Sequence, residues 1–299
     1  MNPDFIEILC NPLNGNSLFL KKDKFLDEKT NQSFEYSKGV ANLLIISETQ
    51  TKNSELHDKL NTSFNYQEHY EKDAALFNYF DKKLDKATKH ENRRLHESIW
   101  RKTAKNPNYI LDVGCGEAWV AKTALSSGIK VISMDISTIN PTKAVNRFPS
   151  KIHLGLVADV FQLPIKENSI ETIIASEIME HVAEPKVFIA SLFKRLKPKG
   201  KLIITTPYNE KLEYCLCIHC NNPTPRHAHI HSFNEQNIKH LIPDNCNWRF
   251  HSFSNFYLTK LRMHFLLSWM PHFLWKIIDS FANKLSGKPT RLLIEIEKK

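Results

Sequence analysis

The sequence lacks any apolar run of the ~18 residues that a transmembrane helix needs. Its first residues hold no basic segment followed by an apolar one, so we expect no secretory leader. Six cysteines are few for 299 residues, and three of them stand alone, which argues against a disulfide framework. We therefore expect a cytoplasmic protein, associated at most with the cytoplasmic face of a membrane.

Nucleic-acid binding has little support either, although the formal net charge is +9. The basic residues are scattered, and no dense Lys/Arg stripe with interleaved aromatic residues is visible. A positive balance is equally compatible with an anionic membrane surface or a phosphorylated substrate, so it selects no partner by itself. Hydrophobic residues at 41% and charged residues at 24% are typical of a soluble globular protein.

The first third of the chain contains two different patterns. Residues 1–50 alternate short apolar runs with turn-forming residues, which predicts a small β unit. Residues 51–107 begin as a polar linker and continue with apolar residues every three or four positions, which predicts helices. These helices either pack on the main sheet or cap the mouth of a site, where Tyr66, His69 and Tyr70 would meet a substrate.

From residue 108 to 299 predicted strands and helices alternate, which is typical of an α/β fold with a parallel sheet. Strands are predicted at 109–113, 130–135, 152–157, 171–176, 200–206, 248–253 and 291–297. Helices are predicted near 118–127, 141–147, 186–196 and 234–241. We expect 196–199 to form a loop into the fifth strand, and the last two strands to pair antiparallel.

One strand–turn–helix segment organises the rest of the chain. A strand containing Asp112 leads into Gly114 and Gly116, and glycine lets the backbone approach a ligand closely. Asp135 ends the second strand, where a carboxylate can accept hydrogen bonds from both ribose hydroxyls of a nucleoside. Asp159 follows the third strand, where it can accept from an adenine amino group. These acids predict a nucleoside site at the carboxyl ends of the strands.

Together these motifs resemble class I S-adenosylmethionine-dependent methyltransferases, especially the small-molecule type that includes ubiquinone-biosynthesis enzymes. The resemblance rests on five motifs in order, over about residues 108–206: Asp112 to Gly116, Asp135, Asp159 with Leu163-Pro164, Ser176 to Val182, and Leu196 to Gly200. It implies a Rossmann-like sheet and S-adenosylmethionine as cofactor. The cofactor-binding residues that it implies are Asp112, Gly114, Gly116, Asp135, Ile136, Asp159, Val160 and Ser176. Ala118 departs from the pattern, since many relatives have a third glycine there.

A nicotinamide-binding Rossmann unit is the main alternative for the same residues. Its fingerprint needs a third glycine at the position of Trp119, next to a bound pyrophosphate. S-adenosylmethionine has no phosphate and needs only the shorter glycine pair. The sequence therefore favours the methyltransferase interpretation.

The N-terminal β unit carries a second resemblance. Cys10-Asn11-Pro12 and residues 36–44 match the outline of the zinc-ribbon module that activates certain methyltransferases. A similar module begins some rRNA guanine methyltransferases. The other metal cysteines of that module are missing, so we expect a ribbon-like β unit without metal.

Catalysis asks little of a methyltransferase beyond alignment, plus a base where the acceptor must lose a proton. Glu180 and His181 follow the fourth strand, and His181 is the candidate base because its ordinary pKa is near neutrality. The alternative is that Glu180 and His181 cap or order the next helix.

The insert 211–233 is rich in cysteine and histidine. Cys217 and Cys220 have the spacing of a metal knuckle, and His229 with His227 would complete a tetrahedral zinc site. Relatives resemble this chain here in carrying a Cys/His insert after the fifth strand. The alternative is a reduced, metal-free loop whose histidines line the acceptor pocket.

The insert 255–289 is aromatic and basic. Two apolar stripes have helical spacing: Leu258, Leu261, Phe265 and Trp269, then Phe273, Ile277, Phe281 and Leu285. Either two helices pack on the sheet or on a dimer partner, or an interfacial hairpin lies on a membrane and admits a lipid-like acceptor. The oligomeric state stays open.

The function predicted from the sequence is methyl transfer from S-adenosylmethionine to a small-molecule or lipid-linked acceptor. RNA is the second acceptor class, because of the net charge and the ribbon-like segment. A third interpretation, from another class, is a non-catalytic cofactor-binding partner protein.

Overall fold

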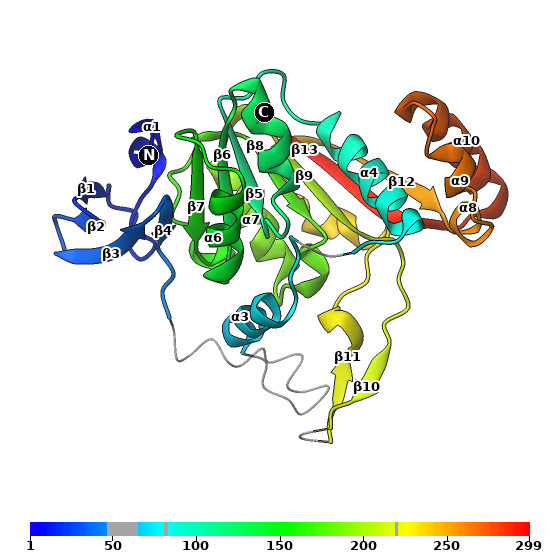
Figure 1. The fold of residues 1–299 in the computed structure, drawn as a ribbon, viewed down its shortest axis with the longest axis horizontal. Helices are drawn as coiled ribbons and strands as arrows, with labels where there is room; N and C mark the ends of the chain where they lie inside the picture. Colours follow the sequence, from blue (N-terminus) through cyan, green and yellow to red (C-terminus); the bar gives the residue numbers. More distant parts are fainter. Residues whose placement is uncertain (47–64, 81–82, 219–220) are drawn as a thin grey trace.

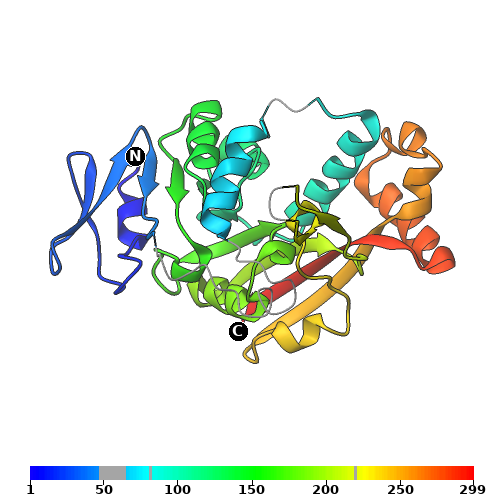
Figure 2. The same cartoon turned by 90° about the horizontal axis from the view of Figure 1, so that it is seen from below.

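The computed structural model describes residues 1–46, 65–80, 83–218 and 221–299, so most of the predicted linker lies outside the described residues. In the described part, an eleven-stranded sheet runs through the molecule and a two-stranded sheet stands apart from it (Figures 1 and 2). The order of the large sheet is β1-β2-β3-β4-β7-β6-β5-β8-β9-β13-β12.

The middle of this sheet is parallel. Its neighbouring strands are β4 (Val40–Asn42), β7 (His153–Val157), β6 (Lys130–Asp135), β5 (Tyr109–Val113), β8 (Ile170–Ser176) and β9 (Leu196–Pro207). The crossover helices are α5 (Trp119–Ala124), α6 (Ile139–Arg147) and α7 (Pro185–Arg195). The far edge is the antiparallel pair β13 (Pro289–Lys298) and β12 (Cys246–Asn255). This topology confirms the α/β, Rossmann-like prediction.

Two local predictions differ from the structure. Residues 196–199 belong to β9 rather than to a loop, and the pairing of β9 with β8 is irregular between Ile170 and Thr172. The helix predicted near 234–241 is only a 3-10 turn, Ile238–Leu241. There the side chain of Asn234 accepts hydrogen bonds from the N–H groups of Gln236 and Asn237, which favours a turn over an α-helix.

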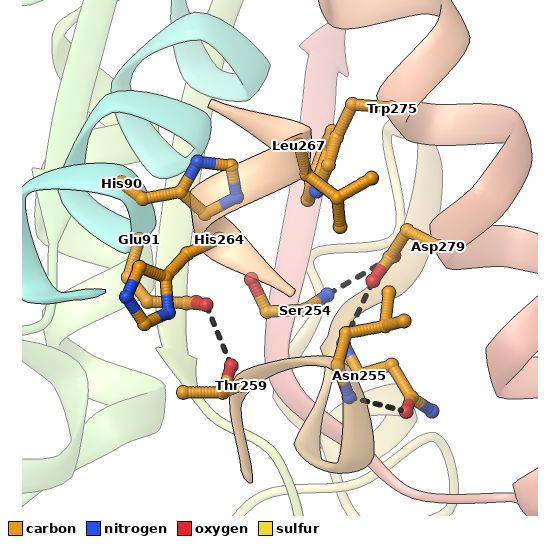
Figure 3. A pocket seen from close by; sticks show the side chains of 10 residues that line it. His90, Glu91, Ser254, Asn255, Thr259, His264, Leu267, Trp275 and Asp279 are labelled. Atoms are coloured by element: carbon orange, nitrogen blue, oxygen red, sulfur yellow. Dashed lines mark hydrogen bonds between the residues drawn. The ribbon is translucent and has the colours of Figure 1, made fainter. Parts of the chain in front are cut away.

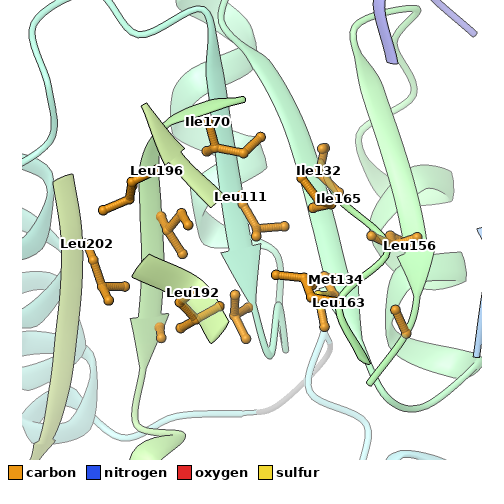
Figure 4. Packing of buried hydrophobic residues seen from close by; sticks show 14 of the residues in the cluster. Leu111, Ile132, Met134, Leu156, Leu163, Ile165, Ile170, Leu192, Leu196 and Leu202 are labelled. Atoms are coloured by element: carbon orange, nitrogen blue, oxygen red, sulfur yellow. The ribbon is translucent and has the colours of Figure 1, made fainter. Parts of the chain in front are cut away.

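The core lies on both faces of the parallel strands. Leu111 of β5 belongs to a cluster that also contains Leu192 of α7, with Ile132 and Met134 of β6 beside it (Figure 4). Its neighbour Ile110 points to the opposite face and packs with residues of α4 and α5. Because both faces are covered, these strands are near-continuous apolar runs, and side chains at their ends carry the chemistry.

The N-terminal unit extends the large sheet. It contains α1 (Asp4–Ile8), β1 (Phe19–Lys21), β2 (Lys24–Asp27) and β3 (Gln32–Ser37), so the first apolar run is a helix rather than a strand. Strand β4 pairs in parallel with β7, with Ala41 opposite Leu156. The unit is closed by Asp27, whose carboxylate accepts hydrogen bonds from the side chains of Asn11, Asn14 and Asn16.

The two predicted cap helices occupy different places. Helix α3 (Tyr66–Leu76) begins at Asn65, whose side chain accepts from the N–H of Glu68, and it lies at the carboxyl edge of the sheet (Figure 2). Helix α4 (Lys86–Trp100) begins at Asp85 in the same way and packs against the insert that follows β12.

The two inserts are a hairpin and a helical unit. The hairpin is β10 (Tyr214–Leu216) with β11 (Pro223–Pro225). The helical unit contains α8 (Phe256–Lys260), α9 (His264–Leu267) and α10 (His272–Ser286), so the first predicted helix is broken, with Arg262 at φ +57°. In the described part of the chain, no helix combines the length and apolarity needed to cross a bilayer.

Candidate functional site

The turn after β5 has the backbone that a close ligand approach requires. Gly114 has φ +67° and Gly116 has φ +43°, and Ala118 also adopts a left-handed conformation, with φ +55°. A Cβ on Gly114 would lie 2.2 Å from Cδ1 of Ile178, so a larger residue there would be strained and would force the Ile178 side chain to move. The small, buried Ala118 permits the turn where many relatives have glycine.

Trp119 occupies the third-glycine position and has a packing role. Its ring stacks on the His96 ring of α4, with centroids 4.1 Å apart. This contact packs α4 against the start of α5, and the position lacks the glycine that the dinucleotide fingerprint requires.

Three carboxylates lie along the carboxyl ends of β5, β6 and β7, which are neighbours in the sheet. Asp135 accepts from the N–H of Ser137 and from Nδ2 of Asn140, both at 3.0 Å. Asp159 accepts from the N–H of Phe161 at 2.9 Å. Asp112 is buried in β5. Its pKa is raised mainly by this burial and to a smaller extent by the nearby charge of Asp135.

This arrangement fits a ligand that carries hydrogen-bond donors. Oδ2 of Asp112 is buried and has no hydrogen-bond partner among the described residues. Burial also raises the pKa of Asp135. Ribose hydroxyls and an adenine amino group are donors of the required kind. The other predicted cofactor residues, Ile136, Val160 and Ser176, are half-buried at the same strand ends, and Ser176 shares a 2.9 Å hydrogen bond with Thr205.

Helix α3 closes over this edge, as the capping alternative predicted. Tyr66 donates its hydroxyl proton to Oδ2 of Asp159 at 2.5 Å. Glu71 accepts from the N–H of Thr138 at 2.7 Å, just beyond Asp135. The helix therefore contacts both the predicted adenine side and the predicted ribose side of the site.

A second cluster lies beside the first. Glu180 and His181 form a short turn after β8, and His229 reaches them from the Cys/His insert. The rings of His181 and His229 have centroids 4.8 Å apart. The main-chain carbonyl of Glu180 accepts from the N–H groups of Ile230 (2.9 Å) and His231 (3.2 Å), which ties the insert to the turn.

Both histidines of this cluster have one nitrogen already engaged. His181 donates from Nδ1 to the carbonyl of Ala228 at 3.2 Å, and His229 donates from Nδ1 to the carboxylate of Glu210 at 2.6 Å. In each neutral ring the remaining nitrogen, Nε2, then carries a lone pair. A lone pair of this kind can accept a proton or bind a metal ion.

The protonation states of the cluster follow from its burial. Burial and the neighbouring His229 lower the pKa of His181 to about 4, so His181 is neutral at physiological pH. Burial, then the charge of Glu177, raises the pKa of Glu180. Oε2 of Glu180 has no hydrogen-bond partner among the described residues. Glu177 itself forms an ion pair with Arg291 of β13.

The residues predicted to bind zinc are only partly brought together. The ligand atoms of Glu180, His181 and His229 lie within 4.8 Å of one another, and among the described residues Cys217 and His227 do not belong to this group. The His227 ring lies 5.9 Å from that of His229, between centroids. Cys220 lies outside the described residues.

Several residues of the site were not identified from the sequence. Glu210 contacts the predicted residue His229, whereas Glu71 and Arg291 contact Thr138 and Glu177, which lie next to predicted site residues. Tyr66 was foreseen only as a substrate contact, not as a partner of Asp159. No local pattern marks them, because each contact joins segments at least 19 residues apart.

Comparison with known proteins identifies the family. Residues 84–249 match the model of a family described as a methyltransferase domain, which is more than half of the chain. The chain belongs to this methyltransferase family. The match confirms the family predicted from the glycine turn and the acidic strand ends.

The relatives of this methyltransferase agree with the match. It is 28% identical over 136 residues to the ubiquinone biosynthesis O-methyltransferase of Rickettsia akari, over 45% of this chain and 50% of that protein. It is 33% identical over 117 residues to the mitochondrial ubiquinone biosynthesis O-methyltransferase of Bos taurus, over 36% of this chain and 31% of that one. The chain thus spans at most about half the length of these relatives.

A solved structure confirms the fold. An S-adenosylmethionine-dependent methyltransferase from Mesorhizobium loti superposes with a TM-score of 0.51, at 15% sequence identity. The likeness covers 70% of this chain and all of that one. At this identity the agreement concerns the arrangement of the sheet and its helices.

Proposed function

We propose that this protein transfers the methyl group of S-adenosylmethionine to a small-molecule or lipid-linked acceptor. The observation that carries the proposal is the convergence of Gly114, Asp135 and Asp159 at one sheet edge, beneath α3. In this arrangement the turn at Gly114 faces the methionine part, Asp135 holds the ribose and Asp159 the adenine. Bound S-adenosylmethionine supplies an activated methyl group.

The protein's own contribution is alignment and proton removal. Tyr70 of α3 lies against the His181 ring, with centroids 6.0 Å apart, so the cap and the turn after β8 together form the acceptor side. His181 is neutral, and its Nε2 can take a proton from an acceptor hydroxyl. Burial raises the pKa of Glu180, and in its protonated form this side chain can donate a hydrogen bond to the acceptor.

The acceptor class is supported by the relatives and by the surroundings of the site. Proteins named ubiquinone biosynthesis O-methyltransferase match this chain, which supports a hydroxylated, lipid-linked acceptor. RNA remains the second acceptor class. The third candidate function is that of a non-catalytic protein that binds the cofactor.

One labelling experiment separates these functions. We expect tritium from methyl-labelled S-adenosylmethionine to enter the organic phase of a membrane lipid extract and not total RNA, measured by phase partition. His181→Asn should reduce labelling at least ~100-fold, the usual contribution of a general base, without changing cofactor affinity in calorimetry. Label in RNA would favour the second class. Cofactor binding without label in either fraction would favour the non-catalytic interpretation.

The cluster of Glu180, His181 and His229 supports a second role for the same residues. Two imidazoles and a carboxylate suit zinc and related divalent cations. Each imidazole donates its Nδ1–H to an oxygen, which is the usual support of a metal-binding histidine. We propose this set as an alternative to zinc bound by Cys217, Cys220, His227 and His229. A metal-bound His181 would not act as a base, so the two roles exclude each other.

Metal analysis of variants distinguishes the two donor sets. If the first set binds the ion, His229→Ala and Glu180→Gln should lose at least ~90% of the metal seen in the wild type by plasma mass spectrometry, whereas Cys217→Ser should keep it. Loss in Cys217→Ser would instead assign the ion to the cysteine set. A wild-type protein that is folded, binds its cofactor and contains no metal would contradict both.

A further inference from the structure

The helical insert carries an unusual concentration of exposed apolar side chains. Of the 20 large hydrophobic side chains that are exposed in the described part of the chain, 11 lie between residues 256 and 285. They are Phe256, Tyr257, Leu261, Phe265, Leu266, Trp269, Phe273, Leu274, Ile277, Phe281 and Leu285. Scattered apolar residues on a surface are ordinary, but a concentration on one small unit marks an interaction site.

The helices that carry these side chains are fixed firmly to the domain. Arg94 of α4 is fully buried and donates from Nη2 to the carbonyls of Leu267 (2.6 Å) and Met270 (2.7 Å). Its guanidinium lies 5.2 Å from the centroid of the Trp275 ring. The helical insert is therefore packed firmly against the rest of the domain.

A second anchor lies at the end of β12 (Figure 3). Asp279 of α10 accepts from the N–H of Ser254 at 3.1 Å and from that of Asn255 at 2.7 Å. Nearby, Thr259 donates to Glu91 of α4 at 2.7 Å. These residues also line a small pocket. Because their polar groups already form the hydrogen bonds that anchor the insert, we assign the pocket no ligand.

The anchors determine which face of α10 is exposed. Trp275 and Asp279 point inward, whereas Phe273, Ile277 and Phe281 remain 60–63% exposed. These three share one side of the helix because they are four residues apart. Helix α10 packs on the sheet, as one alternative from the sequence predicted, but through Trp275 and not through this apolar stripe.

The exposed charges of the insert itself have one sign. Residues 256–288 contain five basic side chains, all exposed: Lys260, Arg262, Lys276, Lys284 and Lys288. The single acid of this stretch, Asp279, is buried and hydrogen-bonded. Lys86 of α4 adds a further cation, 5.6 Å from the centroid of the Phe265 ring. An apolar face with a basic border is the pattern of helices that lie in an anionic membrane interface.

We propose that α8–α10 form a docking surface for an anionic lipid bilayer. Helix α10, with 15 residues, is about 22 Å long, enough to lie in the interface plane without crossing it. A second copy of the chain is a poorer occupant, because pairing these faces would bring ten cations together without an exposed acid from either insert. The surface lies beyond residue 249, where the family match ends, so the proposal does not rest on that match.

The insert is attached to the sheet near the acceptor side of the proposed site. The chain leaves the sheet after Asn255 and returns at Pro289, which are paired with each other. Close by, Arg291 pairs with Pro207 at the carboxyl end of β9 and forms an ion pair with Glu177, three residues before Glu180. Docking through α8–α10 thus places the carboxyl edge of the sheet near the lipid headgroups.

Vesicle flotation with the full chain tests the surface. We expect the protein to float with phosphatidylcholine vesicles containing one third phosphatidylglycerol at low salt, and much less with phosphatidylcholine alone or at high salt. The triple variant Phe273→Ser, Ile277→Ser, Phe281→Ser should reduce partitioning at least ~10-fold, since each exposed side chain contributes by burial in the interface. Lys276→Glu with Lys284→Glu should reduce it on anionic vesicles.

Matched variants elsewhere provide the controls. Leu216→Ser removes an equally exposed apolar side chain from β10, and Lys22→Glu with Lys29→Glu reverses two exposed charges in the N-terminal unit. Both should float like the wild type. The proposal is wrong if the wild type stays at the bottom of the gradient at low salt, or if the triple variant floats equally well. Light scattering that shows a dimer abolished by the triple variant, without flotation of the wild type, would assign the face to a second copy. Because flotation needs no cofactor, none of these results depends on the enzymatic proposal.

Discussion

Replacing Asp135 with alanine is expected to lower the affinity for S-adenosylmethionine by at least about 100-fold. Hydrogen bonds to a charged group contribute ~1.5–3 kcal/mol each, and two ribose hydroxyls are the proposed donors. The carboxylate is held for this purpose by the N–H of Ser137 and by Asn140. Titration calorimetry with the purified variant measures the loss directly.

The same variant must be shown to fold, because Ser137 and Asn140 lose their acceptor in it. Thermal unfolding separates a loss of binding from a loss of structure. Asp23→Ala, which removes an exposed acid from the N-terminal unit, is the control and should bind the cofactor normally. An Asp135→Ala protein that is folded and binds as tightly as the wild type would remove Asp135 from the cofactor site.

The second large effect concerns stability. Arg94→Met should lower the free energy of unfolding by about 3 kcal/mol, because the carbonyls of Leu267 and Met270 would be left in a buried place without their donor. Methionine keeps most of the apolar length of the arginine side chain, so the loss reports the polar contacts. Urea unfolding followed by tryptophan fluorescence measures it.

The neighbouring residue gives a matched control for this prediction. Arg93 also donates to the insert, to the carbonyl of Ser268 at 2.7 Å, but it is exposed. Water can replace that contact, so Arg93→Met should cost less than about 1 kcal/mol. If both variants unfold at the same urea concentration as the wild type, Arg94 does not anchor the insert.

The positions of the proposed cofactor residues at neighbouring strand ends could be predicted from the sequence because their determinants are local. Gly114 and Gly116 mark a turn that only unusual backbone angles can make, and the apolar runs before Asp135 and Asp159 place these acids at strand ends. In a parallel sheet the carboxyl ends of neighbouring strands lie side by side. The residues at these ends can therefore be predicted to lie together without knowledge of any long-range contact.

The acceptor half could not be predicted in the same way. His229 reaches Glu180 and His181 across 48 residues of intervening chain, through an insert whose path no periodicity describes. The Cys/His spacing pointed to a zinc site within the insert, whereas the side chains that lie together come from both the insert and the turn after β8. Spacing identifies ligands only when the two ends of a site belong to one continuous segment.

For helix α10, the sequence could not predict which face of the helix meets the protein, and the reason is different. Hydrophobic periodicity identifies the two faces of a helix but not which of them meets the protein. Here the inward face holds Asp279, whose burial is possible because two backbone N–H groups of β12 satisfy its carboxylate. No sequence pattern reveals that an acid will be buried against backbone N–H groups. Periodicity alone would therefore place the apolar stripe in the core, whereas in the structure it lies on the outer surface.

The parallel pairing of β4 with β7 sets the limits of the unit that can fold. The family match begins at residue 84, yet β7 receives its outer partner from residues 40–42, with further main-chain hydrogen bonds from Leu43 and to Gly39. A chain shortened to the matched segment would expose the unpaired backbone N–H and C=O groups of β7. Because β7 is apolar, such an exposed edge strand can pair with strands of other molecules and cause aggregation. The segment that matches the methyltransferase family is therefore smaller than the smallest piece of this chain that we expect to stay in solution without aggregating.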